Sequence, residues 1–123
     1  MNVLLDTNVI LWMLAGSPIS AAARSAIETG DRVFVSAASI WEITVKTALG
    51  QLVSPTDLSE RLLDLGAQPL ALEWEHARAV GELPPLHRDP FDRMLIAQAV
   101  VEQLTLVTRD ATIQRYDVPT IAA

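Results

Sequence analysis

Short apolar runs recur along the chain, and segments with helical periodicity separate them. Most of the runs are apolar without alternation, as strands covered on both faces of a sheet are. The five expected strands are Val3–Leu5, Arg32–Ser36, Pro69–Leu72, Leu104–Thr108 and Val118–Ile121.

Helical patterns fill the intervals between these runs. Ser20 to Gly30 opens on a capping residue and ends on a glycine, and the helix that starts at Asp89-Pro90 has proline at its first position. Its expected inner stripe is Leu95, Ile96, Ala99, Val100 and Gln103, and the other expected helices are one that begins near Asn8, Ser39–Leu49, Pro55–Leu65 and Glu73–Gly81. Strands that alternate with helices predict an α/β fold, a three-layer α/β/α sandwich around a mainly parallel sheet of about five strands.

Composition narrows the class of protein. With 123 residues, half of them hydrophobic, the chain has the size and apolar content of one compact domain spanning residues 1–123. It has no cysteine, which excludes disulfides, thiolate metal sites and cysteine nucleophiles. Neither a basic leader nor an apolar run of roughly 18 residues is present, so we expect a cytoplasmic protein.

The net charge alone does not identify a partner. With 15 acidic and 9 basic side chains the net charge is −6, which argues against nucleic acid because lysine and arginine drive phosphate binding. That argument weakens if several acids share one pocket and divalent cations neutralise them. The placement of the acids therefore carries the information.

Four acids are expected at one edge of the sheet. Asp6 and Asp110 follow strands, Glu42 lies in the first turn after the second strand, and Asp92 lies in the first turn of the helix that leads into the fourth. In a parallel sheet the carboxyl ends of the strands share an edge with the starts of these helices, and open α/β folds bind their ligands there.

Each of these acids also has a purely structural explanation, as a helix cap. Asp6 would cap the helix that begins near Asn8, and Asp110 would cap a turn over Ala111–Arg115. The pair Ser39 and Glu42 has the spacing of a capping box, and the pair Asp89 and Asp92 has the same spacing. Capping does not remove the repulsion between like charges that lie a few ångströms apart. No cluster of basic residues interleaves with the four acids, so a hard divalent cation with oxygen ligands is the natural counterion.

Carboxylates that hold Mg²⁺ or Mn²⁺ suit phosphodiester hydrolysis, because the metal activates water and offsets charge on the leaving oxygen. A nucleophilic triad is not indicated, since His76 and His87 have no serine in a strained turn nearby. His87 precedes Asp92 by five residues, and we expect it to be a surface loop histidine. Glycine-rich phosphate loops are absent.

Four motifs resemble those of the PIN-domain nucleases, and most of all the VapC-type toxins of bacterial toxin–antitoxin pairs. They are Leu4-Leu5-Asp6-Thr7-Asn8-Val9, Ser36-x5-Glu42, Asp92-x3-Ile96-Ala97 and Leu106-Val107-Thr108-Arg109-Asp110, and the resemblance runs from residue 2 to about Ile121. It implies an α/β/α sandwich, an acidic pocket for Mg²⁺ or Mn²⁺ and endonucleolytic cleavage of RNA that inhibits translation and growth. It also implies homodimerisation and inhibition by a cognate VapB-type antitoxin.

The resemblance transfers roles to individual residues. Asp6, Glu42, Asp92 and Asp110 match the catalytic, metal-binding acids of the family, and the polar residues that match its site-supporting positions are Asn8 and Thr108. Asp89 is an additional acid in the segment His87-Arg88-Asp89-Pro90-Phe91-Asp92-Arg93, and we expect it to cap the helix and not to bind metal.

Basic and aromatic residues flank the acids. We hypothesise that RNA phosphates are held by Lys46, Arg88, Arg93 and Arg109, although Lys46 also has the spacing to pair with Glu42 on one helix face. Three tryptophans suggest base stacking, but packing in a core or interface is the favoured role for Trp12, Trp41 and Trp74. The stretch Leu52–Leu65, together with Trp41 and Leu49, is a candidate partner surface.

Two other classes of function fit parts of the pattern. An aspartyl-phosphate protein, receiver-like or dehalogenase-like, would use Asp6 after the first strand, but it needs no acid at both Glu42 and Asp92. A non-catalytic, metal-free binding module would keep every activity after Asp92→Asn. Retention of phosphate on Asp6, or unchanged activity of that variant, distinguishes these alternatives from the nuclease.

Overall fold

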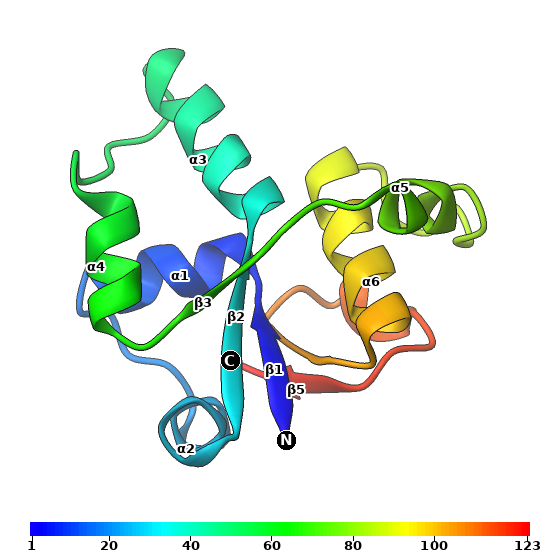
Figure 1. Cartoon of the computed structure of the whole chain (residues 1–123), viewed down its shortest axis with the longest axis horizontal. Coiled ribbons are helices and arrows are strands. Elements are labelled where there is room, and N and C mark those ends of the chain that lie inside the picture. Colours follow the sequence, from blue (N-terminus) through cyan, green and yellow to red (C-terminus); the bar gives the residue numbers. More distant parts are fainter.

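A computed structural model describes the whole chain, residues 1–123, and its centre is a five-stranded sheet (Figure 1). The order of the strands is β3-β2-β1-β4-β5, and every neighbouring pair is parallel. The strands are β1 (Asn2–Leu5), β2 (Arg32–Ser36), β3 (Gln68–Leu70), β4 (Thr105–Thr108) and β5 (Thr120–Ala122). Each expected strand is present, and β2 has the expected bounds.

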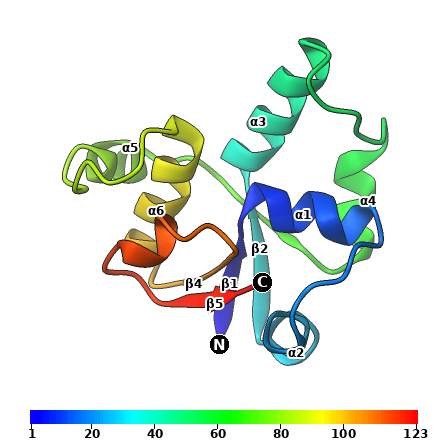
Figure 2. The ribbon, with the colours of Figure 1, turned by 180° about the vertical axis from the view of Figure 1, so that it is seen from behind.

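Helices cover both faces of the sheet. They are α1 (Thr7–Leu14), α2 (Ala21–Thr29), α3 (Ala37–Ala48), α4 (Leu58–Asp64), α5 (Trp74–Val80) and α6 (Pro90–Glu102), with a short 3₁₀ helix at Ile113–Arg115. Both views show α1, α2, α3 and α4 on one side of the sheet and α5 and α6 on the other (Figures 1 and 2). The expected three-layer α/β/α architecture is confirmed. None of these helices has both the length and the apolar content that crossing a bilayer requires.

Alternate side chains of the strands build two hydrophobic cores, because successive residues of a strand point to opposite faces. Val3 and Leu5 of β1 pack in one cluster with residues of α1, α2, α3 and α4, whereas Leu4 packs in the other with residues of α6. These β1 side chains are at most 2% exposed, so the strand is covered on both faces. The two cores therefore fix the position of β1, and with it the edge of the sheet at which β1 ends, after Leu5.

Some boundaries differ from those expected, and the hydrogen bonds of Ser36 and Ser39 explain one difference, the start of α3. α3 begins at Ala37, because Ser36 Oγ accepts the main-chain N–H of Ala38 at 2.9 Å and Ser36 is the N-cap. Ser39 lies inside the helix, where its hydroxyl accepts a hydrogen bond from Thr7 Oγ1 at 2.9 Å, so the capping box of Ser39 with Glu42 is wrong. α4 begins at Leu58, three residues later than expected.

The inner face of α6 also differs from the expected stripe. Leu95, Ile96 and Ala99 are buried, but Val100 is 46% exposed. Gln103 is the C-cap, with a left-handed backbone at φ 57°. In place of these two, the structure buries Gln98, whose Oε1 accepts from Ser36 Oγ and whose Nε2 donates to the carbonyl of Ala71. The helix thus carries a satisfied polar contact on its inner face.

Candidate metal centre

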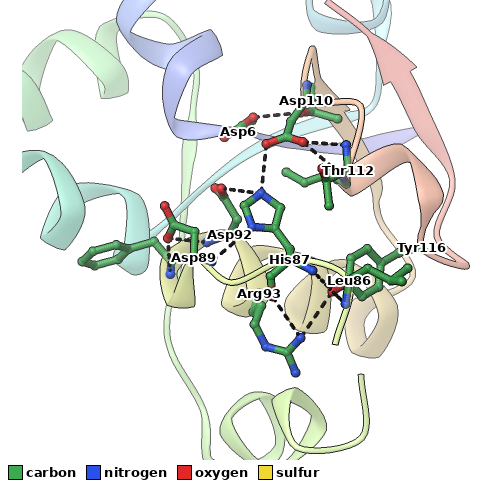
Figure 3. A network of polar contacts seen from close by, with 12 residues as sticks. Asp6, Leu86, His87, Asp89, Asp92, Arg93, Asp110, Thr112 and Tyr116 are labelled. Atoms are coloured by element: carbon green, nitrogen blue, oxygen red, sulfur yellow. Dashed lines mark hydrogen bonds and ion pairs between the residues drawn. The ribbon is translucent and has the colours of Figure 1, made fainter. Parts of the chain in front are cut away.

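The four predicted acids lie at the carboxyl edge of the sheet, each delivered by a different element. Asp6 is the N-cap residue of α1 directly after β1, and Asp110 is the second residue after β4. Asp92 is the third residue of α6, and Glu42 is the sixth of α3, so Glu42 stands in the second helical turn and not in the first. In Figure 3, Asp6, Asp92 and Asp110 gather around the ring of His87.

Thr108 joins two of these acids. Its Oγ1 donates to Asp6 Oδ2 at 2.7 Å and accepts the main-chain N–H of Asp110 at 3.0 Å. Both Asp6 and Thr108 are buried. The side chain of Asp6 makes no capping hydrogen bond to α1 of full geometry, and Thr108 of β4 is its strongest partner, ahead of the main-chain N–H of Asn8.

Glu42 is buried and only half satisfied. Its Oε2 lies 2.6 Å from Lys46 Nζ, one turn further along α3, while its side chain is 7% exposed. Its Oε1 is the one fully buried side-chain polar atom in the chain that has no hydrogen-bond partner. Buried polar atoms are normally paired, and an unpaired one is costly, so this oxygen indicates a missing cationic or hydrogen-bonding group.

The electrostatics of Asp92 and Asp6 also favour a cation. Burial, together with the charges of Asp6 and Asp89 and against the opposing effect of His87, raises the pKa of Asp92 to about 7. Burial likewise raises the pKa of Asp6, and the hydrogen bond from Thr108 only partly offsets this effect. Both carboxylates are thus destabilised as anions, a cost that a bound divalent cation would relieve.

His87 belongs to the site, and its expected position in a surface loop is wrong. Its side chain is 15% exposed, and its Nε2 lies 2.9 Å from Asp110 Oδ2 and 3.1 Å from Asp92 Oδ2. The loop folds inward because the hydroxyl of Tyr116 accepts the main-chain N–H groups of Leu86 and His87, at 3.2 and 2.8 Å. Sequence offered one signal, the place of His87 five residues before Asp92.

Asp110 and His87 stabilise each other's charged forms. Burial acts to raise the pKa of Asp110, but hydrogen bonds from His87 and from the N–H groups of Ile113 and Thr112 outweigh it, so the pKa is lowered. Burial acts to lower the pKa of His87, but the hydrogen bond with Asp110 and the charge of Asp92 raise it above its ordinary value. One oxygen of Asp110 also caps the following turn, as expected, through Thr112 N–H at 2.7 Å and Ile113 N–H at 3.2 Å.

Asp89 is a capping residue. Its Oδ1 accepts the main-chain N–H groups of Phe91 at 2.8 Å and Asp92 at 3.4 Å, at the N-terminus of α6. The capping role expected for it is confirmed. The other predicted supporting residue, Asn8, is exposed and makes no side-chain hydrogen bond to the acids, in contrast to Thr108.

The four basic residues occupy different environments, which separates their roles. The guanidinium of Arg93 already donates to the carbonyls of Val80, Leu83, Pro84 and His87 and to the hydroxyl of Tyr116, which disfavours phosphate binding by this residue. Lys46 is paired with Glu42, and Arg109 lies over the ring of Trp12, 3.9 Å from its centroid. Arg88 is exposed and forms no ion pair. Among the four, it remains the best candidate for binding a phosphate.

Two of the tryptophans lie outside the core. Trp74 is 89% exposed, and Trp41 is 58% exposed with its ring edge-on to Phe91, centroids 4.9 Å apart. Trp41 borders an apolar groove of about 590 Å³ between α3, α4 and β3, whose other walls include Ile40, Leu62, Leu63 and Leu70. The candidate partner surface predicted around Leu52–Leu65 thus contains a hollow.

The donor set matches a hard divalent cation. Three carboxylates, those of Asp6, Glu42 and Asp92, are at least largely buried, and the unpartnered oxygen of Glu42 needs a positive partner. Carboxylate oxygens of Asp92 and Asp110 also lie within 4.8 Å of each other, which is close enough to share one ion. Oxygen-rich sites of this kind suit Mg²⁺ or Mn²⁺, and the absence of cysteine disfavours softer metals.

Comparison with known proteins agrees with this geometry. Residues 3–119 match the PIN domain family. The chain is 30% identical to Ribonuclease VapC22 of Mycobacterium tuberculosis (strain ATCC 25618 / H37Rv), over 96% of this chain and 94% of that protein.

Solved structures share the fold across nearly the whole chain. The VapBC2 complex of Rickettsia felis, bound to a DNA fragment from its promoter, has a similar chain with a TM-score of 0.75 at 16% identity, covering 98% of each. A toxin–antitoxin complex from Klebsiella pneumoniae has one with a TM-score of 0.68 at 17% identity, covering 98% of this chain and 96% of that one. The resemblance inferred from the motifs is confirmed, and the chain belongs to the PIN domain family, among its VapC-type members.

Proposed function

We propose that the protein is a Mg²⁺- or Mn²⁺-dependent endoribonuclease and that its active site is the carboxylate cluster. The observation that carries the proposal is the buried, unpartnered Oε1 of Glu42, beside an Asp92 whose pKa is raised to about 7. Asp6, Glu42 and Asp92 would hold the cation, with Asp110 at the margin of the site.

When bound, a divalent cation lowers the pKa of a coordinated water and offsets charge on the leaving oxygen. The chain's own residues prepare for it. Thr108 orients Asp6 through the hydrogen bond at 2.7 Å, and Lys46 holds one oxygen of Glu42 at 2.6 Å, which leaves the other oxygen for the cation. Exposed Arg88, four residues before Asp92, would attract the RNA backbone. An acidic protein can thus bind a polyanion at a local positive site.

RNA as the substrate is supported by the named activity of the relative, Ribonuclease VapC22. A toxin role, acting on cytoplasmic RNA to inhibit translation and growth, is supported by the structural neighbours, which come from VapBC and toxin–antitoxin complexes. We infer a homodimer on the family resemblance of the motifs.

Cleavage of a labelled RNA by the purified protein tests the enzymatic proposal. Wild type should cleave when Mg²⁺ or Mn²⁺ is present, stop with EDTA and recover when the cation is added back. Asp92→Asn should be inactive under every condition, whereas Asp64→Asn, which changes an exposed acid on α4, should match wild type. Cleavage that persists in EDTA, or equal cleavage by Asp92→Asn, would overturn the metal-nuclease proposal.

We propose a VapB-type antitoxin as the partner of the apolar groove. The groove exposes Trp41 and Leu63, which are 58% and 56% exposed and therefore available to an apolar segment of another chain. Co-expression with the product of a small reading frame directly upstream should yield a complex. Leu63→Glu should abolish the complex and leave RNA cleavage intact, while Val100→Glu, at a 46% exposed position on α6 outside the groove, should retain it. Retention of the complex by Leu63→Glu would place the partner elsewhere.

A further inference from the structure

The two ring nitrogens of His87 face different partners, and the partners fix the tautomer. Nδ1 accepts the main-chain N–H of Asp89 at 3.1 Å. A main-chain N–H can only donate, so Nδ1 carries a lone pair and the proton of the neutral ring is on Nε2. Nε2–H then donates to Asp110 Oδ2 at 2.9 Å, and Asp92 Oδ2 lies 3.1 Å from the same nitrogen (Figure 3).

Groups outside the carboxylate cluster hold this ring in place. The main-chain N–H of His87 donates to Tyr116 Oη at 2.8 Å, and the same hydroxyl donates to the carbonyl of Pro84 at 2.8 Å. Arg93 Nη1 contacts the carbonyl of His87 at 3.4 Å. The backbone position of His87 is therefore set by Tyr116 and Arg93, independently of the acids that its ring contacts.

This arrangement is the reverse of a metal-ligating histidine. A ligating ring presents an unprotonated nitrogen to the metal and donates its other N–H to a carboxylate, a carbonyl or water. In His87 the nitrogen away from the cluster faces a donor, Asp89 N–H, so moving the proton to Nδ1 would set two N–H groups against each other. The nitrogen toward the cluster has no lone pair to offer.

The hydrogen bonds of His87 also decide which oxygens remain for a cation. Asp110 Oδ1 accepts two main-chain N–H groups and its Oδ2 accepts from His87, so few of its lone pairs are left. Asp92 Oδ2 lies 3.1 Å from His87 Nε2. The imidazole thus restrains Asp110 and lies against one oxygen of Asp92.

We propose that His87 is a positioning residue of the metal site, which holds Asp110 through a hydrogen bond from Nε2, packs the same nitrogen against Asp92 and stays outside the set of metal ligands. This inference rests on the proposed metal-dependent function. It assigns to the histidine a role in presenting carboxylate oxygens, and none in binding the ion.

Titration with Mn²⁺ tests the positioning role, with free Mn²⁺ counted by electron paramagnetic resonance. His87→Ala should weaken Mn²⁺ binding by about 10- to 100-fold, the usual effect of losing a group that orients a ligand. His87→Gln keeps an N–H donor near the position of Nε2 and should recover most of the affinity. A glutamine variant as weak as the alanine variant, or an alanine variant equal to wild type, would overturn the proposal.

The Asp92→Asn variant distinguishes an error in the positioning role of His87 from an error in the proposed metal site. If that variant loses Mn²⁺ binding while His87→Ala retains it, the metal site stands and the positioning role is wrong. If Asp92→Asn binds Mn²⁺ as wild type does, the metal site itself is wrong, and the positioning role falls with it. Thermal unfolding of each variant establishes that the comparison is made on folded protein.

Nitrogen-15 NMR tests the ligand question directly, because the chain has only two histidines. At a pH where both rings are neutral, His87 should show the Nε2–H tautomer before and after saturation with Mg²⁺. Loss of that proton on adding Mg²⁺ would make His87 a ligand and overturn the proposal. His76 on α5, whose Nδ1 accepts Glu73 N–H at 3.0 Å, serves as the internal reference.

Discussion

Thr108 Oγ1 and Asp6 Oδ2 are 2.7 Å apart, across 102 positions of sequence. The bond connects the ends of two neighbouring parallel strands, since β1 pairs with β4. Through its second contact, to the main chain of Asp110, the same hydroxyl sets the spacing between two acids of the site.

Thr108→Val should therefore destabilise the protein by about 1–3 kcal/mol, because it leaves Asp6 and the N–H of Asp110 without a partner at nearly constant volume. Urea unfolding in the presence of EDTA measures the effect. Thr105→Val, on the same strand at a half-buried position with no side-chain hydrogen bond, is the matched control and should change stability far less. Equal effects of the two substitutions would show that the hydroxyl of Thr108 has no special role.

Asp92→Asn should stabilise the metal-free protein, since it removes a buried carboxylate that the charges of Asp6 and Asp89 repel. At pH 8 the expected gain in the free energy of unfolding is about 1–3 kcal/mol. With Mn²⁺ present the order should reverse, because wild type gains stability from the bound ion and the variant does not. Loss of stability in EDTA would contradict the electrostatic account of the site.

The stability of the metal-free protein should fall as pH rises from about 4 to about 7. Asp92 has a pKa of about 7 when folded and near its ordinary value of 3.8 when unfolded, so the folded state binds more protons in this window. The raised pKa of Asp6 acts in the same direction. Urea unfolding in EDTA across this range measures the slope, which saturating Mg²⁺ should reduce or invert. A rise in stability with pH, in EDTA, would contradict the prediction.

Arg93 and Arg88 should respond to substitution in opposite ways. Arg93→Lys should cost about 1–3 kcal/mol of stability, because one ammonium cannot replace a guanidinium that contacts four carbonyls and a hydroxyl. Arg88→Gln should leave stability unchanged, weaken RNA binding and reduce its salt dependence by about one phosphate contact. Unfolding curves and binding to labelled RNA at several salt concentrations separate the two effects. An equal loss of RNA affinity in two fully folded variants would restore Arg93 as a phosphate ligand.

The arrangement of strands and helices could be predicted because it depends on local pattern. Runs such as Val3–Leu5 are apolar throughout, and a parallel strand covered on both faces needs such a run. The topology of a parallel sheet then placed Asp6 and Asp110 on one edge without knowledge of any contact. Asp89 was correctly expected to cap α6, because an N-cap followed by proline is a local signal.

What could not be predicted depends on contacts between distant residues. His87 turns inward because of Tyr116, 29 positions away, and Arg93 is occupied by carbonyls of the turn that follows α5. The start of α3 differs from the expected one for a similar reason. Ser36 and not Ser39 provides the cap, and Ser39 accepts a hydrogen bond from Thr7. Sequence spacing identifies which groups can reach a site, but these tertiary contacts decide which of them remain available.

The central claim is that Asp6, Glu42 and Asp92 enclose a divalent cation at the carboxyl edge of the sheet. Anomalous diffraction from crystals grown with Mn²⁺ measures this most directly, because the ion is located by its own scattering. We expect a Mn²⁺ peak bound by oxygens of these carboxylates, including Glu42 Oε1, with His87 Nε2 outside its coordination shell. A well-ordered cluster without a peak, or an ion bound only elsewhere on the protein, would contradict it.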